Sequence, residues 1–322
     1  MVSAGRAVAG VTVAVAAALV LLTGVFLVLR AHSGDPAADA TGIRGAAAAA
    51  GSYGGPSAPA GGQAAMAPQG TSPGAPHANP LSGAAAAWVA GRAGTVRAAV
   101  YDVATGQSWR LGDGPVQAEA SVVKLDILET LLARHGVSGL SAADKSLARS
   151  MIEDSDNDAA TSLWDEAGGA GGLAAYNDEA GLTRTTPSSC VTCSGFPWPG
   201  WGLTTTVPYD QLVLLRQLVV PGEQPLLSHA ARSYALSLLE HVAPGQRWGV
   251  SAGVPAGVTV ALKNGWLPLD GVNSNWQVNS VGWVSGGGRD YLIAVFSTGT
   301  ATEKYGIETI SHLSKLVWSA LG

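Results

Sequence analysis

Residues 121–132 of the 322-residue chain read SVVKLDILETLL. The leucines at positions 125, 128, 131 and 132 recur at intervals of three or four, which predicts a helix with one apolar face. Ser121 and Lys124 are three residues apart at the start of this helix, so their side chains lie next to each other on one face. The stretch therefore predicts a helix that carries a hydroxyl and an amine side by side at its amino end.

A serine beside a lysine has the components of a nucleophile and its base. A serine hydroxyl attacks only when a neighbouring base takes its proton, and a lysine whose pKa is lowered by burial or by nearby cations can do this. The amino end of a helix also points backbone N–H groups and a positive dipole end at the reacting atom. The pair is a weak signal alone, because an exposed serine and lysine is the simpler interpretation.

Two further short motifs follow along the chain. Ser155-Asp156-Asn157 lies between two helical patterns, where its hydroxyl can relay a proton and its amide can hold a carbonyl. Taken alone, this triplet is more simply a helix N-cap. Lys263-Asn264-Gly265-Trp266 ends a β-rich run and puts a cation beside a backbone that a substrate can approach closely. Lys304-Tyr305-Gly306 has the same pattern but starts the last predicted helix, so we discount it.

The order S-x-x-K, S-D-N, K-x-G is far more specific than any one of its members. On these three motifs, residues 84–322 resemble the serine penicillin-recognising family, which includes β-lactamases and D-alanyl-D-alanine peptidases. The resemblance implies an α/β (α+β) fold in which an antiparallel sheet adjoins a helical lobe, with the serine at their junction. It implies a serine hydrolase that uses no cofactor and no metal ion.

The resemblance also assigns catalytic roles. Ser121 would be the acylated nucleophile and Lys124 its base, while Ser155 would pass a proton to the leaving group. The backbone N–H groups of Ser121 and Trp266 would form the oxyanion hole. The other matching residues would bind the substrate: Asn157, Lys263, Asn264 and Gly265.

This chain departs from the family pattern in three ways. Asn264 stands where the third motif usually has threonine or serine, and only 34 residues separate Ser121 from Ser155. Class A β-lactamases also carry a glutamate that activates the deacylating water, in a loop after the second motif. The corresponding stretch here, Thr185–Thr206, contains no aspartate or glutamate. We therefore expect an acyl-enzyme that persists, which disfavours efficient β-lactamase activity.

The same loop contains both cysteines of the chain, Cys190 and Cys193. In an oxidising exterior a C-x-x-C pair most simply forms a disulfide that holds the loop. A thioredoxin-like redox site needs a βαβ context that is missing here, and two cysteines alone do not complete a zinc site. Core packing is the default for the tryptophans of the C-terminal half, although those beside the third motif can floor a sugar or peptide cleft: Trp198, Trp201, Trp248, Trp266, Trp276 and Trp283.

Strand patterns occur at both ends of the domain, with helical patterns between about 119 and 243. The predicted strands are residues 95–103, 107–111, 258–264, 275–284 and 291–298, and a last helix carries an apolar face through residues 307–317. This order predicts one five-stranded antiparallel sheet built from both ends of the domain, with a helical lobe inserted.

The first 83 residues have a different composition, with only five charged side chains. Residues 7–29 form an uncharged apolar run, long enough as a helix to span a bilayer, after a short cytoplasmic end at 1–6. Its length favours an uncleaved anchor over a cleaved signal peptide, which would leave the protein secreted. Residues 30–83 are predicted to be a disordered linker rich in alanine, glycine, proline and serine, with a reach of about 40 Å. The domain at 84–322 is then extracytoplasmic.

The weakly negative net charge of −5 argues against nucleic acid as a partner, because phosphate binding needs clustered lysine and arginine. The predicted function is a membrane-anchored serine hydrolase that acts by acyl transfer on a cell-wall peptide or another amide or ester. Two alternatives stay open. One is a true β-lactamase that turns over β-lactam-like small molecules, and the other is an inactive relative that binds muropeptide or a partner through the same cleft.

Overall fold

The structure is a computed structural model that describes residues 77–193, 200–220, 222, 225–269 and 275–322. The predicted span at 7–29 and most of the predicted linker lie outside the described residues. Among the helices that are described, none has the length and apolar character needed to cross a membrane. The anchor, the linker and their boundaries therefore stay predictions.

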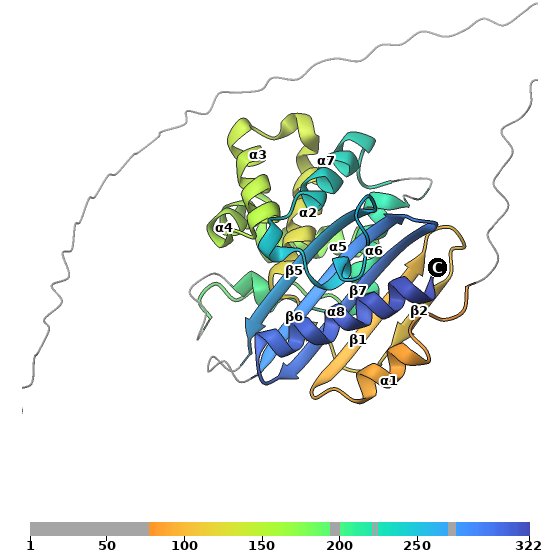
Figure 1. The fold of residues 1–322 in the computed structure, drawn as a ribbon. Coiled ribbons are helices and arrows are strands. Elements are labelled where there is room, and N and C mark those ends of the chain that lie inside the picture. Colours follow the sequence, from red (N-terminus) through yellow and green to blue (C-terminus); the bar gives the residue numbers. More distant parts are fainter. Residues whose placement is uncertain (1–76, 194–199, 221, 223–224, 270–274) are drawn as a thin grey trace, which may run out of the picture. The chain divides into compact units, whose positions relative to one another are not determined.

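A five-stranded antiparallel sheet forms the centre of the fold, as the sequence predicts. Its strands occur in the order β2-β1-β7-β6-β5 (Figure 1), so strands from the start of the domain pair with strands from its end. Their bounds are Thr95–Asp102 (β1), Ser108–Leu111 (β2), Thr259–Pro268 (β5), Trp276–Gly286 (β6) and Arg289–Thr300 (β7). The prediction that β5 stops near Asn264 is wrong, because Gly265 and Trp266 go on pairing with Asn279 and Val278 of β6. The third motif therefore lies inside a strand.

Each face of the sheet packs against a separate layer of helices. On the central strand β7, Ile293 and Val295 join one apolar core and Ala294 and Phe296 join the other, because successive side chains point to opposite faces. Helices α1 (Ala84–Ala90) and α8 (Glu303–Ala320) cover the first face. The second face receives the inserted lobe, whose helices are α2 (Val123–Gly139), α3 (Ala142–Arg149), α4 (Asn157–Glu166), α5 (Gly169–Ala180), α6 (Pro208–Val219) and α7 (His229–Glu240).

A short two-stranded ribbon, which the sequence analysis missed, links the sheet to the lobe. It pairs β3 (Gln117–Ala118) with β4 (Thr205–Thr206). One strand leads directly into the 3₁₀ helix η1 (Ala120–Val122), and the other follows the 3₁₀ helix η3 (Gly200–Leu203). The Glu119 N–H donates to Thr204 O at 2.8 Å, which continues the pairing toward η1. The ribbon thus brings two distant segments to the amino end of α2. The remaining short helices are η2 (Ser150–Asp154), η4 (Pro244–Gln246) and η5 (Gly249–Ser251).

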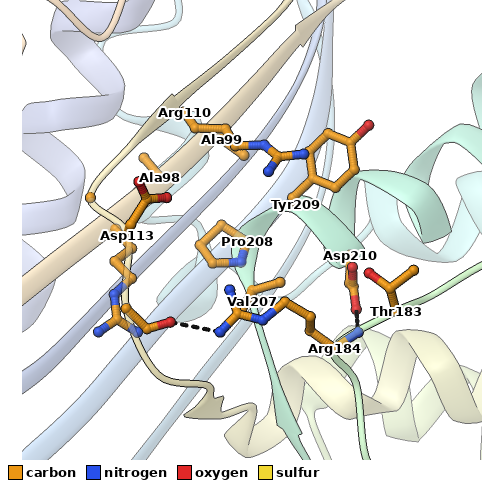
Figure 2. Close-up of a pocket in the computed structure, with 13 residues that line it drawn as sticks. Ala98, Ala99, Arg110, Asp113, Thr183, Arg184, Val207, Pro208, Tyr209 and Asp210 are labelled. Carbon is orange, nitrogen blue, oxygen red and sulfur yellow. Dashed lines mark hydrogen bonds between the residues drawn. The ribbon is translucent and has the colours of Figure 1, made fainter.

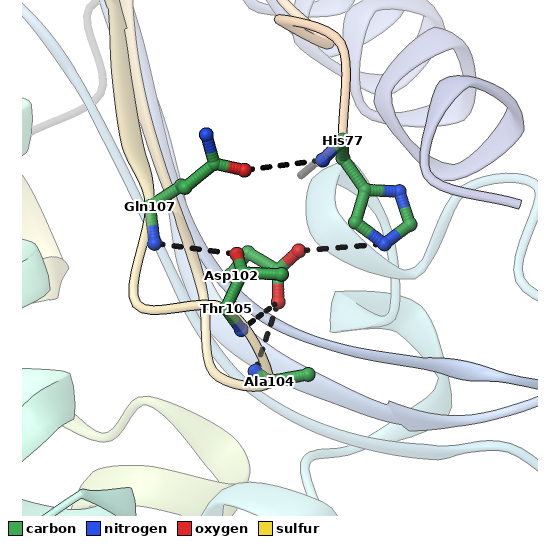
Figure 3. Close-up of polar contacts among 5 residues, drawn as sticks. All are labelled: His77, Asp102, Ala104, Thr105 and Gln107. Carbon is green, nitrogen blue, oxygen red and sulfur yellow. Dashed lines mark hydrogen bonds and ion pairs between the residues drawn. The ribbon is translucent and has the colours of Figure 1, made fainter. Parts of the chain in front are cut away.

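The described chain begins against the turn that joins β1 to β2 (Figure 3). The His77 N–H donates to Gln107 Oε1 at 3.1 Å, and His77 Nε2 lies 3.6 Å from Asp102 Oδ2. The other oxygen of Asp102 accepts the N–H groups of Ala104 and Thr105, at 2.9 and 3.1 Å. These contacts fix the start of the described chain at the outer hairpin of the sheet.

Helix α2 is buried on all sides over residues 123–132, rather than on the one face that its leucines predict. Its acidic residues are therefore inside the protein. Asp126 accepts from the Asn177 amide at 2.8 Å, and Glu129 Oε2 accepts from the Tyr176 hydroxyl at 2.8 Å. Burial raises the pKa of Asp126 to about 7 and raises the pKa of Glu129 well above its usual range. The lobe thus has carboxyl groups that favour the protonated form.

We predict that Glu129→Gln reduces the loss of stability on going from pH 5 to pH 8. A carboxyl whose pKa is higher in the folded than in the unfolded state makes the free energy of unfolding fall as pH rises above the unfolded pKa, by up to about 1.4 kcal/mol per pH unit. Glutamine does not titrate, so urea unfolding of the variant should depend less on pH. Glu308→Gln, at an exposed position of α8, is the control that should behave like the wild type. A Glu129→Gln variant with the wild-type pH dependence would contradict the prediction.

Candidate active site

The first two motifs and Lys263 of the third meet where the sheet adjoins the lobe. The Lys124 amine is the centre of the group, with Nζ 3.1 Å from Ser121 Oγ and 3.1 Å from Ser155 Oγ. Lys263 Nζ donates to the same Ser155 hydroxyl at 2.9 Å. Ser121 and Ser155 are half-buried, whereas both lysines are fully buried. The hydroxyls of Ser121 and Ser155 thus both contact the Lys124 amine, and the Ser155 hydroxyl also contacts the Lys263 amine.

Two non-glycine residues in the described part of the chain have a left-handed backbone, and both are in this group. Ala120, just before the nucleophile candidate, has φ 53°, and Ser155 has φ 59°. This conformation is unfavourable for residues with a Cβ, and it persists only where the surrounding structure enforces it. At Ser155 the left-handed conformation ends η2, and the side chains of Ser155 and Asp156 then make different contacts. Asp156 caps α4 by accepting the Ala159 N–H at 2.7 Å, while Ser155 contacts Lys124 and Lys263.

The hydrogen bonds around Lys124 suit a neutral amine. Its Nζ lies 2.6 Å from the Ser155 carbonyl oxygen and 2.7 Å from Asn157 Oδ1. Both of these oxygens can only accept, so they take two N–H groups. A neutral amine has no third N–H, and its single lone pair can then accept from one of the two hydroxyls. The geometry therefore gives Ser121 an acceptor for its proton at 3.1 Å.

The electrostatics agree with this protonation state. Burial lowers the pKa of Lys124 to about 7, and the negative charge of Asp156 acts in the opposite direction. Burial, followed by the neighbouring charge of Lys124, lowers the pKa of Lys263 well below its ordinary value. Two ammonium groups this close to one hydroxyl repel each other, so loss of a proton from either is favoured. At neutral pH a large fraction of Lys124 can act as a base.

Strand β5 approaches the start of α2 so closely that position 265 has no room for a side chain. A Cβ on Gly265 would lie 2.6 Å from the Ser121 nitrogen and 2.7 Å from the Val122 nitrogen. Gly265 thus lets the strand backbone come close to Ser121, the nucleophile candidate, and Trp266 is the next residue along the strand. This is the arrangement expected if the Ser121 and Trp266 N–H groups act together on one oxyanion.

Asn264 lies in the same strand, but its side chain is directed elsewhere. Its amide nitrogen donates to Gln246 O at 2.6 Å and to Trp248 O at 3.2 Å. Side chains alternate along a strand, so Asn264 lies on the face opposite to Lys263 and Gly265. The structure therefore does not bring this amide to the site, and its predicted contact with a substrate carboxylate has no support from the geometry.

The loop that lacks an acidic residue places an indole beside Lys124 instead. Lys124 Nζ is 5.1 Å from the centre of the Trp201 ring, and the Trp201 Nε1–H donates to Thr161 Oγ1 at 3.2 Å. Trp201 is buried and lies in η3, which packs against η1. The sequence analysis did not assign Trp201 to the site. The Gly-Trp-Gly triplet at 200–202 could have indicated it, because glycines on both sides of the tryptophan allow the backbone to come close to other segments.

The predicted disulfide between Cys190 and Cys193 is confirmed. It supports the same loop, since the Gly200 N–H donates to Cys190 O at 2.7 Å. A Cβ on Gly200 would lie 2.4 Å from the Cys193 sulfur. The disulfide therefore packs directly against the residue before Trp201. The described residues contain no group of acidic, histidine or cysteine side chains that could hold a metal ion.

The tryptophans have separate positions rather than one shared surface. Trp248 and Trp266 are half-buried with ring centres 5.7 Å apart, near the strand that carries Lys263. Trp283 is held by a hydrogen bond from its Nε1–H to Asp290 at 2.6 Å, away from the motifs. Trp198 lies outside the described residues. Only Trp201 contacts the amine of the first motif among the aromatic rings that the structure describes.

Residues 137–321 match the family described as Beta-lactamase enzyme family, a match that begins after the first motif. The chain is 30% identical over 225 residues to a protein of Mycobacterium tuberculosis named "Putative lipoprotein LppW", which covers 68% of each chain. It is similar in fold to a β-lactamase from Chitinophaga pinensis (TM-score 0.64, 18% identity, 74% of this chain and 97% of that one). It is also similar to the structure of PBP-A (TM-score 0.60, 23% identity, 72% of this chain and 92% of that one).

We predict that the reaction of Ser121 with a fluorophosphonate speeds up with a midpoint near pH 7. The neutral form of Lys124 accepts the serine proton, and this form becomes more abundant as pH rises through the pKa of about 7. An ordinary lysine would give a rise only near pH 10. The measurement is the labelling rate of the purified full-length protein between pH 5 and pH 9.

Two variants control this profile. Lys124→Gln should lose the rise together with most of the rate, while Lys304→Gln, at an exposed position of α8, should keep both. A wild-type rate that does not change between pH 6 and pH 8 would show that Lys124 is not the base.

Proposed function

Because the chain belongs to the Beta-lactamase enzyme family, we propose that it is a serine hydrolase that forms an acyl-enzyme at Ser121. The observation that carries the proposal is the contact of a fully buried lysine amine with the Ser121 hydroxyl at 3.1 Å. Its other neighbours leave the lone pair of the neutral amine for a hydroxyl. A structural lysine would instead have a carboxylate partner, and no such pair occurs in the described residues.

The proposed acylation step follows from these contacts. Lys124 takes the proton of Ser121 as Oγ forms a bond to the carbonyl carbon of the substrate. The negative charge that develops on the carbonyl oxygen is stabilised by the N–H groups of Ser121 and Trp266. Ser155 then gives its proton to the leaving nitrogen or oxygen as that bond breaks. Lys124, whose Nζ lies 3.1 Å from Ser155 Oγ, then passes to Ser155 the proton that it took from Ser121.

The proposed substrate is a peptide-type amide or ester, such as a cell-wall peptide, that carries a negative charge near the reacting carbonyl. Lys263 supports this choice, because its amine donates to the Ser155 hydroxyl, and an anionic group next to it would favour its charged form. The contribution of Asn264 to anion binding is not part of the proposal, since its amide donates to Gln246 O and Trp248 O. PBP-A and the β-lactamases are similar to this chain in fold alone.

We further propose that the acyl-enzyme is long-lived in water. Hydrolysis requires a water molecule next to the ester and a base to deprotonate it. In the described part of the chain, the indole of Trp201 covers Lys124, 5.1 Å from its amine, and no carboxylate hydrogen-bonds to the lysine. This favours transfer to an acceptor that binds beside Ser121 over rapid turnover of β-lactams.

The proposed location is the outer side of a membrane, with the run at residues 7–29 as a single-pass anchor. The Cys190–Cys193 disulfide supports an oxidising compartment. The relative of Mycobacterium tuberculosis is named as a lipoprotein, which is also a membrane-attached class of protein.

The central experiment treats the full-length protein with a fluorescent penicillin and with a fluorophosphonate, beside Ser121→Ala. We expect a stable adduct with both probes in the wild type and none in the variant. Loss of the penicillin label within minutes would instead identify a β-lactamase. If neither probe labels a folded sample, the protein is not a serine hydrolase, and binding through the cleft is the remaining function.

We predict that Trp201→Ala shortens the lifetime of the penicillin adduct by about tenfold or more. Removal of the indole opens a space beside Lys124 that water can enter, and the amine can then act as a base for it. The measurement is the decay of the fluorescent adduct after excess probe is removed. Thr161→Val, which loses only the hydrogen bond from the indole N–H, is the matched control and should keep the long lifetime. An unchanged lifetime in Trp201→Ala would mean that the indole does not exclude the reacting water.

A further inference from the structure

A cavity of about 110 Å³ lies at the outer edge of the sheet, separate from the motif residues (Figure 2). Its walls come from β1, β2, the loop that follows β2, residues 183–184 and the start of α6. This volume is enough for several water molecules and therefore admits a small anionic group. None of the residues predicted for catalysis or substrate binding lines it.

Three arginines line this cavity: Arg97 from β1, Arg110 from β2 and Arg184 from the segment after α5. Arg97 is the inner one, with only 6% of its surface exposed, while Arg110 and Arg184 are at the mouth. In the part of the chain that the structure describes, none of the three has a carboxylate within 4.0 Å. A buried guanidinium is almost always paired, so this positive charge has no protein counterion.

The existing contacts of these arginines are with neutral groups. Arg97 donates to Pro115 O, and Arg184 Nη2 donates to Gly114 O at 2.7 Å. Arg110 stacks over the Tyr209 ring, 3.7 Å from its centre. These contacts orient the guanidinium groups without cancelling their charge, and the Nε of Arg97 is buried with no hydrogen-bond partner.

Two carboxylates also line the cavity, but neither neutralises it. Asp210 is committed to the chain, because its Oδ2 accepts from the Arg184 backbone N–H at 2.7 Å and from Thr185 Oγ1 at 2.9 Å. Asp113 is exposed and acts on Arg97 only at a distance. Burial and the nearby charge of Arg184 lower the pKa of Arg97, and Asp113 opposes them only in part. The cavity thus keeps an excess positive charge.

The amino end of α6 adds to this field. The helix starts at Pro208 in the cavity wall, and its N-cap residue, Val207, has no side chain that can accept from the first N–H groups. The positive end of the helix therefore faces the same space as the guanidinium groups. Three guanidinium groups and the start of one helix thus line this cavity.

We propose that this cavity is a binding site for a small oxyanion, namely a carboxylate or phosphate group carried by a ligand. Guanidinium groups bind both of these through paired N–H···O bonds, and Arg97 and Arg184 are oriented by one loop so that an anion between them would meet donors from both. The site is independent of Ser121, so the proposal goes beyond acyl transfer. Its failure would leave the proposed hydrolase function untouched.

The test is calorimetric titration of the full-length protein with inorganic phosphate and, separately, with acetate, at constant ionic strength set by chloride. We expect saturable binding at one site with a Kd of about 1 mM for the preferred anion. Preference for phosphate would indicate a phosphate ester as the source of the group, and preference for acetate would indicate a carboxylate ligand. The Ser121→Ala variant should bind equally well, which separates this site from the cleft.

Arg184→Gln and Arg110→Gln, at exposed positions where folding should be unaffected, should each weaken binding by about tenfold or more, because a charged hydrogen-bond donor is lost. Arg149→Gln, an exposed arginine of α3, is the matched control and should bind like the wild type. The proposal is overturned if neither anion saturates, or if both cavity variants bind as tightly as the control.

Discussion

The candidate active site is organised around the burial of one amine. A lysine ammonium in a protein interior is costly, and the cost falls when the group loses its proton. The structure accommodates Lys124 with carbonyl oxygens from Ser155 and Asn157, and it holds Ser155 in a left-handed conformation to do so. The second motif is therefore built to solvate the lysine of the first. The same arrangement places the Lys124 amine 3.1 Å from the Ser121 hydroxyl.

Much of this site was predictable because its parts are short and local. The spacing of Ser121 and Lys124 on a helix follows from the helical repeat, and the Ser-Asp-Asn triplet lies at a helix start where its residues must diverge. The N-cap interpretation of that triplet is confirmed by Asp156, which caps α4, while its two neighbours contact Lys124 and their catalytic roles stay predictions. The five strands were also predicted, because alternating and continuous apolar runs mark them clearly.

Features that depend on contacts between distant segments were not predictable. The β3–β4 ribbon consists of two residues in each strand, too few to leave a periodic signal. The place of Trp201 depends on that ribbon and on the disulfide, and no local pattern shows which of several tryptophans reaches the lysine. Side chains alternate along a strand, so the face of β5 on which Asn264 lies could have been predicted. The predicted strand, however, ended at Asn264. Pairing with β6 extends it, and Gly265 is then held against the Ser121 nitrogen.

The pairing of the first strand with the last sets the order in which the molecule can be completed. Thr95 of β1 is opposite Thr298 of β7. Strand β1 can therefore pair with β7 only after almost the whole domain has been synthesised. Such long-range pairing slows folding, because the chain must close a large loop first. During synthesis, a growing chain can make only the β1–β2 hairpin and local helices. Helix α2 and β5 meet late, so Lys124 and Lys263 come together on Ser155 only when almost the whole domain is present.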